Sequence, residues 1–99
     1  VGVDVNQYNE GLLPDGKSVI LTSAMKYLDR ASFDMIKEEL AGSFKGGRSL
    51  LLTAKEDAVG IPTENPNLSP AVQSKVNEIY NDIKAGKIVV ADSQGNLFR

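Results

Sequence analysis

Residues 19–40, VILTSAMKYLDRASFDMIKEEL, place a short apolar run directly before a helical repeat. The run at 19–22 is rich in β-branched residues, which is typical of a buried strand. From Met25 onward, apolar residues recur at steps of three and four, as on one face of a helix. We therefore predict a strand over 19–22 and a helix from 25 to 40. The expected inward stripe comprises Met25, Leu28, Ser32, Met35, Ile36 and Leu40.

The same alternation of strand and helix patterns continues on both sides of this segment. Further apolar runs predict strands over residues 1–5, 49–54 and 87–92. A second amphipathic pattern predicts a helix from 69 to 85, with its stripe at Val72, Val76, Ile79, Tyr80 and Ile83. The remaining segments predict loops at 6–18 and 55–68 and a turn at 93–96.

Capping signals support both helices. Thr22 or Ser23 can cap the first helix, and Gly42 stands where a glycine after the last turn is expected. Ser69 precedes Pro70, which matches a serine N-cap followed by proline at the first helical position.

The predicted order is β, β, α, β, α, β, with each strand apolar enough to be covered on both faces. This pattern predicts an α/β fold, a mainly parallel sheet layered with helices. We expect the 99 residues to form a single α/β unit over 1–99. A folded chain of this mass has a surface of ~5,500 Å².

Composition excludes several functions. Eleven basic and 13 acidic residues give a net charge of −2, which argues against nucleic-acid binding. The scattered lysines also argue against an anionic membrane surface. The sequence has neither Cys nor His, so it has no thiolate metal site, no Cys nucleophile and no Ser-His-Asp triad. No nucleotide-binding glycine motif is present. We expect no enzyme, no cofactor and no metal.

Polar residues follow the first two predicted strands. Ligands of parallel α/β sheets bind beyond the carboxyl ends of strands, where Asp4 and Lys26 are expected. A carboxylate there can accept hydrogen bonds from vicinal hydroxyls, as on a ribose. A lysine at a helix start is disfavoured by the helix dipole, so Lys26 is expected to donate to a ligand or to pair with Asp4. The predicted ligand-binding residues are Asp4 and Lys26.

Plainer interpretations remain open for each candidate. Asp4 can form an Asx turn with the backbone around Asn6. Lys26 can be a solvated surface lysine. The acidic run at 55–57 is expected to be a solvated loop with one ion pair.

Several short segments, in order, resemble a known family. They are VGVDVNQ at 1–7, LTSAMK at 21–26, FKGG at 44–47, KEDAVG at 55–60 and IKAGKI at 83–88. Together they resemble the C-terminal part of the basic membrane protein family of substrate-binding lipoproteins, which includes purine nucleoside receptors. Asn6 and Ala58 depart from the residues usual in that family, Asp and Gly.

The resemblance implies part of the C-terminal lobe of a type I periplasmic-binding-protein fold. It also implies a nucleoside ligand, an ABC importer permease as partner, and an extracytoplasmic lipoprotein whose lipid anchor is absent from this chain. In the family, the residues matching Asp4 and Lys26 contact the ribose. The chain opens at Val1 without an initiator Met, so we expect a processed product or an excised fragment. Self-association is expected where the missing lobe leaves surface exposed.

A different class of protein shares this fold. Ligand-sensing domains of repressor-type transcription regulators have the same architecture and often an acidic residue at a strand end. A DNA-binding head upstream would favour that alternative, whereas a signal peptide with a lipid-attachment site would favour transport.

Overall fold

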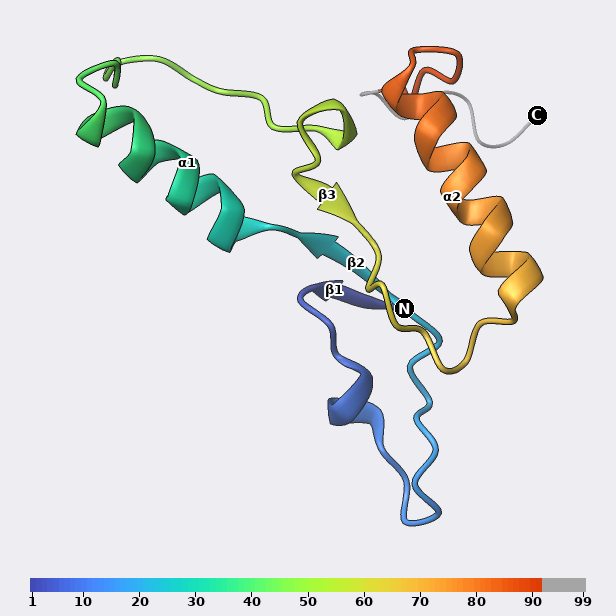
Figure 1. The fold of residues 1–99 in the computed structure, drawn as a ribbon. Coiled ribbons are helices and arrows are strands. Elements are labelled where there is room, and N and C mark those ends of the chain that lie inside the picture. Colours follow the sequence, from blue (N-terminus) through green and yellow to red (C-terminus); the bar gives the residue numbers. More distant parts are fainter. Residues whose placement is uncertain (92–99) are drawn as a thin grey trace.

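The computed structural model describes residues 1–91. Three short strands, two helices and two 3₁₀ turns follow one another along the chain (Figure 1). In chain order they are β1 (Gly2–Asp4), η1 (Tyr8–Gly11), β2 (Ser23–Lys26), α1 (Leu28–Leu40), η2 (Ala54–Glu56), β3 (Val59–Gly60) and α2 (Pro70–Lys84). The turn predicted at 93–96 lies outside the described residues.

The strands form one mixed sheet in the order β1-β2-β3. β1 and β2 are parallel, with Gly2 opposite Ser23 and Asp4 opposite Met25. β3 runs antiparallel to β2 and pairs Gly60 with Met25. The predicted α/β class is confirmed. The sheet was predicted to be mainly parallel, but it has one parallel and one antiparallel pair among the described residues, and β3 arises in a segment that we predicted to be a loop.

The second strand lies four residues later than predicted. Residues 18–20 make other contacts: Ser18 bridges to Leu12, and the side-chain amide of the distant residue Asn67 donates to the carbonyls of Ser18 and Ile20. Backbone groups engaged in this way are not free to join the sheet ladder. The ladder with β1 therefore starts at Ser23.

Helix α1 consequently begins at Leu28 rather than at residue 25. Its N-cap is Tyr27, which makes no side-chain capping bond, so Thr22 and Ser23 do not cap it. The C-terminal prediction is confirmed, because Gly42 follows the helix with φ of 68°, a left-handed conformation that glycine adopts without strain.

Helix α2 matches its prediction closely. The Ser69 side chain accepts a hydrogen bond from the Val72 amide, and Pro70 occupies the first turn. The local capping signals were sufficient here because they need no distant partner.

The two later strand predictions are wrong for the residues described. Residues 50–52 are exposed, Leu51 by 86%, and Thr53 begins η2 through a capping box with Glu56. Beyond α2, the amides of Lys87 and Ile88 both donate to the Asp82 carbonyl, and Val89 is 85% exposed. Residue 92, the last of the predicted strand, lies outside the described part. Short-range hydrogen bonds have taken the place of sheet pairing.

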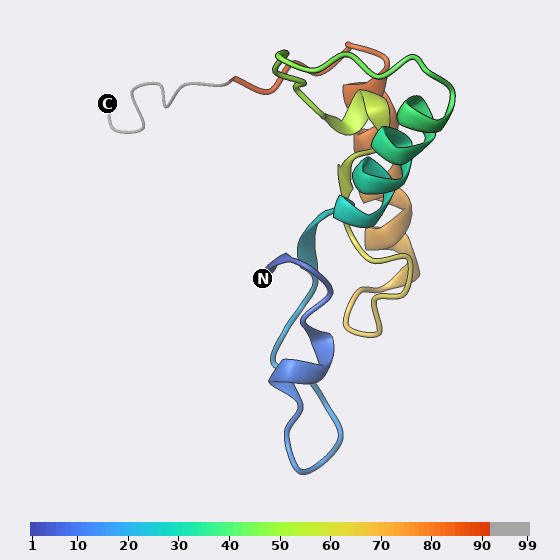
Figure 2. The same cartoon turned by 90° about the vertical axis from the view of Figure 1, so that its left-hand side faces the viewer.

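Burial is much lower than expected. The surface is 7985 Å² and the radius of gyration 16.9 Å, against ~5,500 Å² and ~13 Å for a compact chain of this size. Within residues 1–91 the buried hydrophobic core reduces to Ala54, and Val3 of β1 is 58% exposed. The expectation that both faces of each strand are covered is therefore wrong. Helices α1 and α2 stand apart on opposite sides of β3, and residues 8–20 extend away from both (Figures 1 and 2).

Polar contacts around Asp57 hold α2 in place. The carboxylate of Asp57 accepts from the Tyr80 hydroxyl at 3.2 Å and pairs with Lys84, while Arg30 of α1 lies 4.0 Å away. The pKa of Asp57 is lowered mainly by the hydrogen bond from Lys84. The hydrogen bond from Tyr80 and the charge of Arg30 lower it less. Burial, helped by the bond to Asp57, raises the pKa of Tyr80. One carboxylate thus links η2 to α2 and reaches toward α1.

Replacing Gly2 by alanine is expected to destabilise the chain. A Cβ at Gly2 would lie 2.5 Å from the Ser23 Oγ, closer than real contacts allow. We expect Gly2→Ala to lower the free energy of unfolding by about 1–3 kcal/mol, as overpacking does. Urea unfolding followed by circular dichroism measures this.

Gly46→Ala is the matched control for Gly2→Ala. A Cβ at Gly46 meets nothing closer than Phe44 at 3.8 Å, so the change is expected to be small. Equal unfolding midpoints for the two variants would contradict the assigned contact between Gly2 and Ser23.

Acid is expected to weaken the attachment of α2. Because the pKa of folded Asp57 lies below its ordinary value of 3.8, its stabilising contribution is present above pH 3.8 and is lost as pH falls through the lowered pKa. Asp57→Asn should lower the free energy of unfolding at neutral pH and reduce the loss of that free energy as the pH falls. Hydrogen bonds from Thr53 also lower the pKa of Glu56, so part of the acid-dependent loss should remain in this variant. Unfolding free energies measured from pH 7 downward test this, and parallel curves for the two proteins would contradict it.

Candidate functional site

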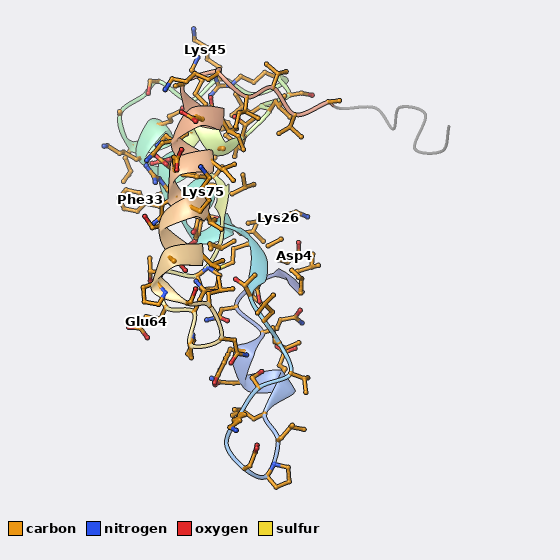
Figure 3. All side chains as sticks on the ribbon, turned by 90° about the vertical axis from the view of Figure 1, so that its right-hand side faces the viewer. Asp4, Lys26, Phe33, Lys45, Glu64 and Lys75 are labelled. Carbon is orange, nitrogen blue, oxygen red and sulfur yellow. The ribbon has the colours of Figure 1, made fainter. Side chains whose placement is uncertain are left out.

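Asp4 and Lys26 meet at the carboxyl ends of two adjacent parallel strands. Asp4 ends β1 opposite Met25, and Lys26 follows as the last residue of β2. The Lys26 Nζ lies 2.9 Å from the Asp4 Oδ1. Figure 3 shows the two labelled side chains next to each other at this edge of the sheet. The structure thus brings together the two residues that the sequence singled out.

Both side chains of this pair are exposed, that of Lys26 by 60% and that of Asp4 by 54%. A solvated ion pair of this kind adds little to stability. It leaves further hydrogen-bonding capacity, since an ammonium has three donors and a carboxylate has several acceptor positions. The pair is therefore better suited to receiving a polar ligand than to stabilising the sheet.

The backbone of Asp4 adopts an uncommon conformation. Its φ is 72°, in the left-handed region that non-glycine residues rarely occupy. Strained residues of this kind gather at ligand sites, where the surrounding structure holds them. The Asx turn considered for Asp4 falls instead at Asn6, whose side chain accepts from the Tyr8 amide. Asn6 is thus a turn residue.

The element that positions Lys26 differs from the one predicted. It ends a strand instead of lying one step into the helix, so the helix-dipole argument does not explain its placement. Thr22 and Ser23 point elsewhere: Thr22 bonds to the side chain of Asn65, and Ser23 is fully buried and accepts from the Gln7 amide.

The acidic run at 55–57 forms more contacts than the solvated loop that we expected. Glu56 completes the capping box of η2, and Asp57 joins the cluster with Tyr80 and Lys84. The sequence signal was the spacing of Tyr80 and Lys84, four residues apart on one face of a helix. The members of this cluster contact one another.

A groove of about 1080 Å³, which the sequence patterns did not predict, lies between the sheet and α2. Its walls are largely apolar and include Val3, Ile61 and Val76, while Lys26 contributes to its lining. The candidate site therefore adjoins an apolar depression.

Within residues 1–91, no group of three or more acidic side chains gathers as metal ligands would. No helix in that range is long and apolar enough to cross a membrane.

Comparison with known proteins places the chain in a family. The family model Bmp, described as ABC transporter substrate-binding protein PnrA-like, matches residues 1–94. A protein named CD4+ T-cell-stimulating antigen from Listeria monocytogenes is 38% identical over 96 residues. The protein of the same name from Listeria innocua is equally similar.

These matches cover 93% of this chain but 27% of each relative, so the chain spans about a quarter of the length of the relatives it matches. The mixed α/β sheet agrees with part of a periplasmic-binding-protein-like fold. The earlier resemblance is confirmed, and the chain belongs to the Bmp family of PnrA-like ABC transporter substrate-binding proteins.

Proposed function

We propose that this chain is part of the nucleoside-binding lobe of an extracytoplasmic lipoprotein that delivers its ligand to an ABC importer permease. Asp4 and Lys26 hold the ribose hydroxyls in this proposal. In this proposal an opposing lobe of the longer protein closes over the ligand. The family match supports the solute-binding role and favours transport over the transcription-regulator alternative.

One observation carries the ligand assignment: an exposed ion pair at adjacent carboxyl ends of parallel strands, with its acidic member in the left-handed region. Ligands of parallel α/β sheets bind at this edge. The Asp4 carboxylate only accepts hydrogen bonds, and the Lys26 ammonium only donates them. Together they match a vicinal diol, in which each hydroxyl can both donate and accept.

The contacts follow from this chemistry. The Asp4 carboxylate accepts from both hydroxyls, and the Lys26 ammonium donates to their oxygens. In the structure the two groups pair with each other at 2.9 Å. Because water surrounds both, separating them for a ligand costs little. The two side chains can therefore exchange their mutual contact for contacts with a diol.

The test is calorimetric titration of the longer protein that carries this sequence with adenosine, guanosine, inosine and uridine. The longer protein is required because a pocket normally encloses most of a ligand's surface, whereas this pair is open. We expect Asp4→Asn to weaken nucleoside binding about 10- to 100-fold, since a hydrogen bond to a charged group is lost. Lys26→Met should weaken it less, because the exposed ammonium is more easily replaced by water.

Glu64→Gln is the matched control, since Glu64 is an exposed carboxylate far from the pair in Figure 3. It should leave affinity unchanged. A 2′,3′-dideoxynucleoside, which lacks the diol, should bind the unaltered protein as weakly as adenosine binds Asp4→Asn. A loss below about twofold in Asp4→Asn would show that Asp4 has only a turn role. No heat with any nucleoside would exclude this ligand class.

A further inference from the structure

The backbone makes a three-residue turn centred on Asp4. The Val5 amide donates to the Val3 carbonyl at 2.9 Å, and Asp4 between them has a φ of 72°. A γ-turn with positive φ at its central residue is rare and strained. Strain of this kind persists only where the surrounding contacts hold it. The contacts around this turn therefore decide where the Asp4 carboxylate points.

Gln7 joins this turn to the neighbouring strand. Its side-chain Oε1 accepts from the Val3 amide at 2.9 Å, and its Nε2 donates to Glu10 at 2.8 Å. Its backbone amide donates to the Ser23 Oγ at 3.1 Å. Ser23 is the fully buried first residue of β2. One residue thus fixes the segment on both sides of Asp4 against a buried part of the sheet.

The Gln7 side chain is better placed to hold the turn than the ion pair is. Gln7 is half-buried, and a Cβ at the buried Gly2 would lie 2.8 Å from its Oε1 and 3.0 Å from its Cβ. The strand backbone therefore packs closely against Gln7. The Asp4 and Lys26 side chains are both more than half exposed, and a solvated ion pair of this kind holds geometry weakly.

We propose that Gln7 is a positioning residue for the ligand site: it holds Asp4 in the left-handed turn and so directs the carboxylate at the diol. This inference rests on the proposed function, and Gln7 itself touches no ligand in it. Without the bond from Gln7 to the Val3 amide, Asp4 can relax to a negative φ, which L-residues prefer. Only the molecules that keep the turn then bind the diol well, so the measured affinity falls with their fraction.

The test is calorimetric titration of the longer protein that carries this sequence with adenosine and with 2′,3′-dideoxyadenosine. Gln7→Met keeps the length of the side chain and removes both of its polar atoms. We expect it to weaken adenosine binding about 3- to 10-fold, the range of one neutral hydrogen bond. Binding of the dideoxynucleoside should not change, because that ligand offers no diol to Asp4. Asn9→Leu, which removes an exposed amide two residues later, is the matched control and should leave both affinities unchanged.

An exchange of donor and acceptor gives a second readout. Gln7→Glu places two carboxylates side by side and should also weaken adenosine binding. Adding Glu10→Gln restores one donor and one acceptor between these positions and leaves an acceptor for the Val3 amide, so most of the affinity should return. This rescue also decides the question if Gln7→Met fails to fold. In an Asp4→Asn background Gln7→Met should have no further effect, because Gln7 acts through the Asp4 carboxylate.

The outcomes separate this inference from the proposed function. Equal affinities of the unaltered protein for the two ligands would overturn both. If the unaltered protein prefers adenosine and Gln7→Met keeps that affinity within about twofold, the inference alone is overturned, and another segment of the longer protein holds the Val3 amide. An equal loss of affinity for both ligands would overturn it too, since Gln7 would then support the fold and not the direction of the Asp4 carboxylate.

Discussion

The close approach of Gly2 to Ser23 is the contact on which the candidate site depends. The two residues are opposite each other in the parallel pair, both are buried, and a side chain at Gly2 would meet the Ser23 hydroxyl at 2.5 Å. This contact sets the register of β1 and β2. Since a slip of one residue turns every side chain to the other face, the same register brings Asp4 and Lys26 together at the far end of the strands.

Polar side chains hold much of the remaining chain together, because little apolar surface is buried. The Asn67 side chain forms hydrogen bonds to the backbone of residues 18–20, and Asp57 links η2 to α2. Such contacts are directional and define geometry, but each adds only modest net stability. Within the described residues, Phe33, Ile36 and Leu40 of α1 are exposed. The same openness explains why the chain has ordered local elements with a surface far above that of a compact domain.

The success of each sequence prediction follows from how local its cause was. Helix α2 was predicted with its cap because Ser69, Pro70 and the apolar stripe act within a few residues. The strand predicted at 49–54 was wrong because a run of leucines does not specify a partner, and the capping box of Thr53 ended it locally. For the site, strand-end reasoning selected Asp4 and Lys26, yet it placed Lys26 on a helix. The groove beside Lys26 and the Asp57 cluster were missed, since both join segments far apart in the chain.

The sequence by itself determined the α/β class, both helices, and the two residues whose charges and positions suit a ligand. These follow from periodicity, capping and residue chemistry, which act over a few positions. Only the tertiary structure decided the strand register, the antiparallel β3, the 2.9 Å approach of Lys26 to Asp4 and the outward direction of the apolar face of α1. Each of these depends on which distant backbone groups and side chains find one another, and periodicity along the chain does not encode that choice.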